Sequence, residues 1–223
     1  MSRLVNPLPV AIALAFGLAV LPLGGCQLFG FIAASAEDLP KTVKPEYTGL
    51  TGKSYAVYVT ADRATQAEFS RIPPELTTRI TNHLFEQNEA IAATGYVPPK
   101  DIIATLSDQP RLLYLPRGEL MDELEVDRLV FVEIDEFRLT EEGNRYVWDG
   151  VATGRVQVYE RDHFFPDEAA YEKAISVRFP DGSGYTEAEF SADTVASVLV
   201  SRFSNRASWL FYEHKEDPKA GYE

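Results

Sequence analysis

Two acidic residues, Glu133 and Asp135, have the types and spacing best suited to chemistry in this 223-residue chain. They lie two residues apart in an apolar, β-branched stretch, so a strand would project both carboxylates from one face, roughly 6–7 Å apart. Such a pair can act as general acid and base, as in a hydrolase of cell-wall or envelope material. The alternative is a polar outer face neutralised by Arg155 on the neighbouring strand. No His, Ser or metal-type cluster accompanies the pair, so we favour the ion-pair interpretation and predict no catalytic residue, no metal and no cofactor.

A second chemical feature is Cys26, the sole cysteine, which ends an uncharged apolar run that begins after Arg3. A short basic start, an apolar segment and small residues before a cleavage point are typical of a secretion signal. The sequence Leu-Gly-Gly-Cys at residues 23–26 resembles the lipobox of bacterial lipoproteins, which are cut before the cysteine that then carries lipid. We therefore predict cleavage between Gly25 and Cys26 and attachment of lipid, such as palmitate, to Cys26.

Two other interpretations of this segment are less consistent with the residues. Residues 4–36 hold no charge and are long enough to span a bilayer, which takes about 20 apolar residues. A continuous helix there would be interrupted by Pro7, Pro9, Pro22, Gly24 and Gly25. Ordinary signal cleavage before Glu37, after the small residues at 34–36, would require an apolar core well beyond the usual ~7–15 residues. It would also discard the sole cysteine.

The charge of the chain limits its partners. There are 34 acidic and 21 basic residues, and Arg3 is the only charged residue in the first 25. An acidic surface repels the phosphates of nucleic acid, which we exclude as a partner. It also repels anionic headgroups, so attachment to a membrane would depend on the N-terminal lipid. A single cysteine cannot form an intramolecular disulfide.

The composition divides the chain into four segments. We expect a signal peptide over 1–25, a lipidated N-terminus and flexible tether over 26–52, a globular α/β domain over 53–214 and a polar tail over 215–223. The tether is proposed because Pro40, Pro45, Gly49 and Gly52 punctuate a stretch without periodicity.

Periodicity within the domain predicts an α/β (α+β) fold of a single domain. Aromatic and β-branched runs predict strands over 55–60, 94–99, 128–139, 146–159 and 171–179. Apolar residues at helical spacing predict helices beginning near residues 73, 100, 116 and 191, with Ser191 capping the last. We expect a mixed, mostly antiparallel sheet of four or five strands, with helices packed on it.

The two longest strands predict which face the helices cover. In 146–159, Gly150, Ala152 and Gly154 alternate onto one face, where small residues let a helix approach closely. In 128–139 the alternation predicts two faces, one with Val130, Val132 and Ile134 and the other with Phe131, Glu133, Asp135 and Phe137.

Trp209, Phe211 and Tyr212, near the end of the last helix, are the candidate partner-binding residues. At 100° per residue they cannot all share the inward stripe of the helix. They either close the core against Tyr55 or Tyr58, or form a recognition surface, since aromatic residues are enriched at binding hot spots.

The three histidines show no ligand spacing. His83 lies beside an apolar helical stripe and is interpreted as a packing or capping residue. His163 and His214 fall in a turn and in the tail, where we expect them to face solvent.

The order of elements resembles a group of envelope lipoproteins. The group includes the curli secretion pore lipoprotein, the activators of penicillin-binding proteins and the N-terminal domain of the Tol-Pal propeller protein. The resemblance rests on residues 53–59, 95–99 and 124–132, where Glu125 stands at a position usually occupied by Gly. It implies fold and location, and it carries no catalytic motif.

These observations predict a membrane-anchored bacterial lipoprotein that is a non-catalytic binding or assembly component of the envelope. The alternative is the hydrolase using Glu133 and Asp135. We expect a protein partner in the envelope, with no oligomeric state predicted. Gln27 follows the lipidated cysteine, and a residue other than Asp there resembles the pattern of outer-membrane sorting, so the domain should face the periplasm.

Overall fold

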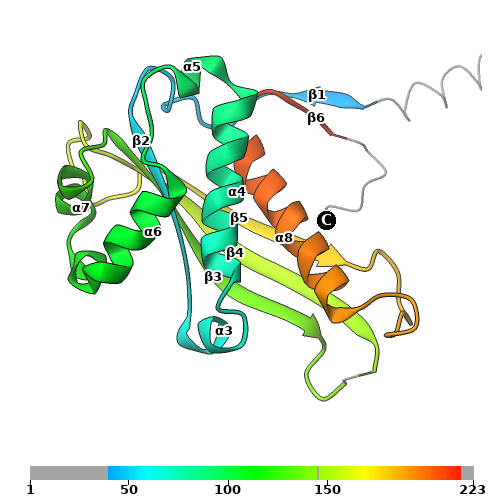
Figure 1. Cartoon of the computed structure of the whole chain (residues 1–223). Coiled ribbons are helices and arrows are strands. Elements are labelled where there is room, and N and C mark those ends of the chain that lie inside the picture. Colours follow the sequence, from blue (N-terminus) through cyan, green and yellow to red (C-terminus); the bar gives the residue numbers. More distant parts are fainter. Residues whose placement is uncertain (1–39, 145, 217–223) are drawn as a thin grey trace, which may run out of the picture. The chain divides into compact units, whose positions relative to one another are not determined.

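The computed structural model describes residues 40–144 and 146–216 (Figure 1). The predicted signal peptide, the cleavage site at Gly25 and the lipidated Cys26 lie outside the described residues, as does most of the predicted tail. Apart from Pro40, Lys41 and Glu216, all described residues belong to one unit, Thr42–Lys215. No helix within the described ranges has the length and apolar character needed to cross a membrane.

A four-stranded sheet forms the centre of this unit. The strands are β2 (Tyr55–Ala61), β3 (Arg128–Thr140), β4 (Trp148–Glu160) and β5 (Tyr171–Phe179), in the order β2-β3-β4-β5. Only the β2–β3 pair is parallel, so the sheet is mixed and mostly antiparallel, as predicted. The predicted strand at 94–99 is reduced to one bridge between Tyr55 and Tyr96. A separate two-stranded sheet pairs β1 (Lys41–Val43) with β6 (His214–Glu216).

Four of the described helices begin within one residue of the predicted positions, and two short ones, at 63–68 and 89–92, were not predicted. The helices are α3 (Arg63–Glu68), α4 (Ile72–Gln87), α5 (Glu89–Ala92), α6 (Pro99–Asp108), α7 (Arg117–Glu123) and α8 (Ala192–Trp209), with a 3-10 helix η1 at Pro110–Tyr114. Two prolines occupy the first turn of α4. Backbone N–H groups in a first turn make no hydrogen bond within the helix, so the N–H that proline lacks is not needed there. Ser191 caps α8 by accepting a hydrogen bond from the Thr194 N–H. The α+β fold class is confirmed.

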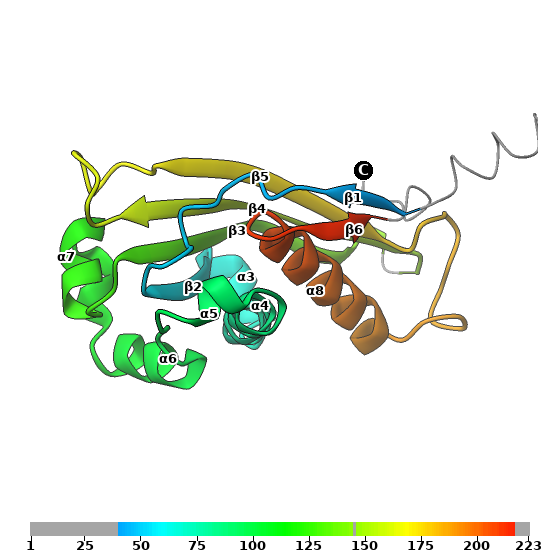
Figure 2. The same ribbon diagram turned by 90° about the horizontal axis from the view of Figure 1, so that it is seen from above.

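Helices α4 and α8 cover one face of the sheet (Figure 2). The approach of α8 depends on the glycines of β4, as the sequence predicted. A Cβ atom on Gly150 would lie 2.9 Å from both Leu199 Cδ1 and Val195 Cγ1, and one on Gly154 would lie 3.1 Å from Phe203 Cζ. Real Cβ atoms rarely come so close to a neighbour, so larger residues at 150 and 154 would push α8 away.

The position of Phe137 differs from the prediction, because β3 contains a bulge. Ile134 pairs with Gly154 whereas Glu136 pairs with Thr153, so Asp135 is the extra residue. An extra residue inverts the alternation beyond it. Phe137 therefore joins the α4/α8 core with Ile134, whereas simple alternation placed it with Phe131. Phe131 packs in the second core, under α6, η1 and α7.

The globular unit begins earlier than residue 53. Tyr47 and Leu50 are buried in the α4/α8 core, and the Tyr47 hydroxyl donates to Glu160 Oε1 at 2.6 Å. The flexible tether predicted over 26–52 therefore does not extend through residues 42–52. Tyr47 and Leu50 lie in irregular backbone. Their burial therefore produces no periodic pattern in the sequence. Likewise, Lys215 is part of β6 and not of a tail.

Helix α7 ends in a left-handed residue at Glu125. Its φ is 54°, and it is the only non-glycine residue with positive φ in the described ranges. The Val126 N–H donates to the Met121 carbonyl at 3.0 Å, the bond that closes a Schellman motif. Glycine is favoured at this position because it lacks a Cβ. Glu125 therefore stands at a position whose backbone conformation favours glycine.

Candidate functional site

The three aromatic residues near the end of α8 have different environments. Phe211 is 2% exposed and its ring contacts the edge of Tyr47, with centroids 6.0 Å apart. This contact places Phe211 in the core, beside a residue that the sequence assigned to the tether. Tyr212 is 7% exposed, and Trp209 is half-buried. Both of these residues line a surface cleft.

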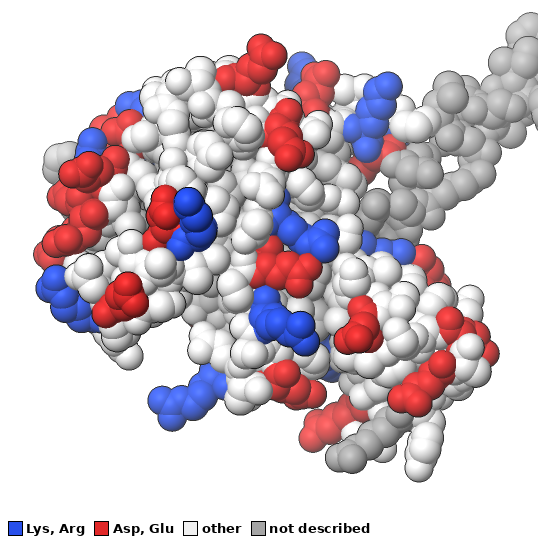
Figure 3. All heavy atoms as spheres, in the orientation of Figure 1, with Lys and Arg blue, Asp and Glu red and all other residues white. Residues whose placement is uncertain are grey.

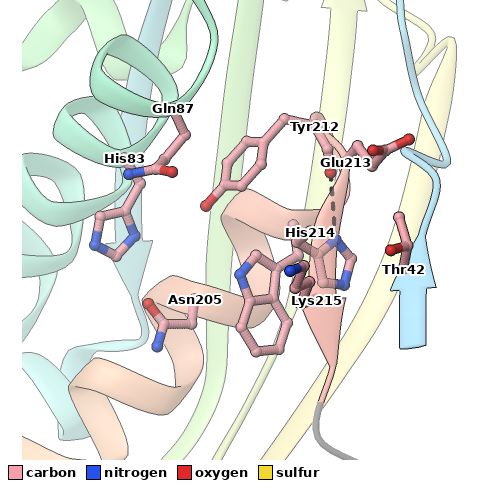
Figure 4. A pocket seen from close by; sticks show the side chains of 9 residues that line it. Thr42, His83, Gln87, Asn205, Tyr212, Glu213, His214 and Lys215 are labelled. Carbon is pink, nitrogen blue, oxygen red and sulfur yellow. Dashed lines mark hydrogen bonds between the residues drawn. The ribbon is translucent and has the colours of Figure 1, made fainter. Parts of the chain in front are cut away.

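The cleft lies between the C-terminal ends of α4 and α8 and the strands β1 and β6 (Figure 4). Its volume is about 480 Å³. It is lined by Thr42, His83, Gln87, Asn205, Trp209, Tyr212, Glu213, His214 and Lys215. Concave sites with a few convergent polar groups are the usual form of ligand sites. The cleft is therefore the candidate functional site.

One wall of the cleft is formed by two stacked rings. The rings of Trp209 and His214 lie 4.6 Å apart with an angle of 7° between their planes. His214 Nδ1 lies 3.2 Å from the Tyr212 carbonyl oxygen, so the ring is held from two sides. His214 was expected to face solvent, but β6 turns it back onto α8.

The cleft contains polar side chains with unused hydrogen-bonding capacity. The amides of Gln87 and Asn205 and the hydroxyl of Tyr212 make no hydrogen bond with any other described residue. Figure 4 shows Gln87 and His83 on one side and Tyr212 opposite them, with Asn205 below. A ligand with donors and acceptors of its own could satisfy these groups.

Burial favours the neutral forms of two titrating groups of the cleft, His83 and Tyr212. Burial lowers the pKa of His83 below its ordinary value, and its Nδ1 lies 3.3 Å from Ser208 Oγ. Burial raises the pKa of Tyr212 to about 12. At neutral pH the cleft therefore offers an uncharged imidazole and an uncharged phenol. Glu213 and Lys215 add one charge of each sign.

Glu133 and Asp135 lie elsewhere, on the sheet, and both are bound by one cation. Arg155 Nη2 donates to Glu133 Oε2 at 2.9 Å and to Asp135 Oδ1 at 3.1 Å. This is the pairing across neighbouring strands that the sequence favoured. No group of three or more His, Cys, Asp or Glu residues in the described part of the chain could hold a metal ion.

Sequence reasoning found one edge of the cleft and missed the rest. Trp209 and Tyr212 were singled out because they fall off the inward stripe of α8. Gln87 and Asn205 gave no signal, because amide side chains are common on helix surfaces. Thr42 was missed because its segment has no periodicity.

The comparisons with known proteins concern the fold. No family model matches the sequence, and a search of curated proteins found no match. A PelC dodecamer structure from Paraburkholderia phytofirmans has 12% identity and a TM-score of 0.43, covering 79% of this chain and 99% of that chain. Lipoprotein GNA1162 from Neisseria meningitidis has 11% identity and a TM-score of 0.43, covering 69% and 96%. The hypothetical protein CT253 from Chlamydia trachomatis has 15% identity and a TM-score of 0.44, covering 69% and 92%.

Proposed function

We propose that this chain is a lipid-anchored, non-catalytic binding protein of the bacterial envelope, which holds an envelope component in the cleft at the end of α8. In this proposal Cys26 carries the lipid, and Gln27 directs the protein to the outer membrane, with the domain facing the periplasm.

The observation that carries the proposal is the set of unpartnered polar groups in the cleft. Gln87, Asn205 and Tyr212 come from two helices and the turn after α8, yet they converge on one space of about 480 Å³. None makes a side-chain hydrogen bond with another described residue. Polar groups placed around a concave surface favour a ligand that satisfies them.

The ion pairs that Arg155 makes with Glu133 and Asp135 argue against the hydrolase alternative. Arg155 binds both Glu133 and Asp135, and all three side chains are about equally exposed, at 41%, 44% and 43%. Both carboxylates are already held in ion pairs with one guanidinium, whereas a general acid must present its carboxyl group to a substrate. If an envelope hydrolase activity is found, Glu133→Gln and Asp135→Asn should leave its turnover unchanged.

Attachment is tested through Cys26. The variant Cys26→Ser should lose labelling with palmitate and should accumulate as an unprocessed precursor. A wild-type protein that is found as a soluble form starting at Glu37 would contradict the anchored function, because that form lacks the cysteine.

A further inference from the structure

The loop that joins β4 to β5 exposes two adjacent phenylalanines. Phe164 is 86% exposed and Phe165 is 53% exposed, and their rings contact edge to face with centroids 4.6 Å apart. Among the described residues they are the only neighbouring pair of exposed large hydrophobic side chains. A phenyl ring has no polar atom that would favour such exposure to water. We call residues 161–168 the Phe loop.

The first part of the Phe loop is fixed to the start of β3. Arg161 donates from Nη2 to Asp127 Oδ1 at 3.0 Å, and its backbone N–H donates to the Asp127 carbonyl at 2.9 Å. Asp162 accepts hydrogen bonds from Arg128 Nη1 and from Lys53 Nζ. These pairs lower the pKa of Asp162, so its carboxylate stays charged. The residues that precede the two rings are therefore held in place.

The second part of the loop is fixed to α7. Asp167 Oδ1 accepts a hydrogen bond from the Gly118 N–H at 2.8 Å. A Cβ on Gly118 would lie 3.1 Å from Pro166 Cβ, so the helix and the loop are in close contact. Inside the loop, the Phe165 N–H donates to His163 Nδ1 at 3.2 Å. The rings are thus presented by a fixed backbone, and an ordered surface loses little conformational entropy on binding.

The surroundings of the two rings are acidic. Glu119 and Glu168 are exposed neighbours of the Gly118–Asp167 contact, and neither forms an ion pair with a described residue. The nearby cations already have partners. Arg161 pairs with carboxylates, and Arg117 lies over the Phe131 ring at 4.1 Å from its centroid. Figure 3 shows acidic side chains gathered on the side of the molecule where α7 lies.

We propose that the Phe loop is a docking site for a second protein, one whose surface offers an apolar pocket bordered by Lys or Arg. Two exposed aromatic rings on a fixed loop have the form of binding hot spots. The carboxylates of Glu119 and Glu168 favour a partner with Lys or Arg around its pocket. A bilayer with anionic headgroups would be repelled by them, and so would a second copy of this chain, whose net charge is −13. The site shares no residue with the cleft, so it stands or fails independently of the proposed ligand site.

The first step of the test is photo-crosslinking in intact cells with the full chain. The amino acid p-benzoylphenylalanine replaces Phe164, and Tyr146 serves as the matched control because it is an 84% exposed aromatic residue on the β3–β4 hairpin. We expect a protein adduct from position 164 that is absent from position 146. An adduct to lipid, an adduct to a second copy of this chain, or no adduct beyond the control would overturn the proposal.

The second step uses the purified partner identified in the first. Phe164→Ala with Phe165→Ala should weaken its affinity at least ten-fold, at an unchanged melting temperature. Glu119→Gln with Glu168→Gln should weaken binding and reduce its dependence on salt. The control pair Glu141→Gln with Glu142→Gln, acidic residues near the tip of the β3–β4 hairpin, should change neither. A partner that is acidic at the crosslinked site, or an affinity unaffected by both the phenylalanine pair and the Glu119/Glu168 pair of substitutions, would overturn the assignment.

Discussion

The indole ring of Trp209 and the imidazole ring of His214 lie nearly parallel, 4.6 Å apart with 7° between their planes. Trp209 is the last residue of α8 and His214 is the first of β6. The stack therefore holds the chain that leaves α8 against the helix itself. The same two rings form the wall of the cleft that faces α4. The contact that fixes the chain after α8 is therefore also part of the proposed ligand site.

Phe211 and Tyr212 should respond differently to substitution, although they are adjacent. Phe211→Ala empties a core position and should lower the free energy of unfolding by about 3–5 kcal/mol. Tyr212→Phe removes a hydroxyl without a described partner, so its effect should stay within about 1 kcal/mol. Chemical denaturation of both variants measures these changes. A loss for Tyr212→Phe as large as that for Phe211→Ala would contradict the absence of a partner for the Tyr212 hydroxyl among the described residues.

Gly154→Ala tests the close approach of α8 to β4. The added methyl would meet Phe203 Cζ at 3.1 Å and the Glu133 carbonyl oxygen at 2.5 Å, so we expect a loss of about 1–3 kcal/mol in unfolding free energy. Gly182→Ala is the control, because its nearest neighbour at 3.3 Å belongs to the ring of Tyr185, which is partly exposed. The control should change stability by no more than about 0.5 kcal/mol. A Gly154→Ala variant as stable as the control would contradict the packing described.

Glu125→Gly should stabilise the protein. A left-handed conformation costs a residue with a Cβ about 1–2 kcal/mol, partly offset by the greater freedom of glycine in the unfolded chain. The net gain in unfolding free energy should be on the order of 0.5–1 kcal/mol. Glu123→Gly, at the last residue of α7, should instead lower stability by up to about 1 kcal/mol, because glycine disfavours the helical conformation. Thermal melts of the two variants should shift in opposite directions, and shifts of the same sign would contradict the cap.

His83 should make stability depend on pH. Burial lowers its pKa in the folded state below the ordinary value of 6.5, so the fold favours the neutral ring. The stabilisation is fully present above about pH 6.5 and is lost as the pH falls through the folded pKa. His83→Gln should weaken this dependence. NMR titration of the ring should give a pKa below 6.5, and a higher value would contradict the burial described.

Much of the fold could be predicted because its elements are long and periodic. Strand β4 alternates small and branched residues, which indicated the face that α8 covers. The alternation failed at Phe137, because a bulge at Asp135 is a property of strand pairing and leaves no mark in one strand. The segment with Tyr47 and Leu50 was missed since irregular backbone has no period.

The candidate site could be predicted only at one edge. Trp209 and Tyr212 were visible because they depart from a helical stripe. The remaining wall needs Gln87, which is far from them in sequence and reaches the cleft only because α4 packs beside α8. Tertiary packing that brings such residues together cannot be read from local spacing.

We propose that the cleft holds an envelope component while Cys26 keeps the protein on the membrane. The most direct measurement is photo-crosslinking in intact cells from p-benzoylphenylalanine at Gln87, with Glu142 on the β3–β4 hairpin as the control position. We predict an adduct in the membrane fraction from position 87 only, which is lost when Asn205→Ala is added. An adduct of equal yield from position 142, no adduct from position 87, or one that persists undiminished with Asn205→Ala would contradict a ligand site in the cleft.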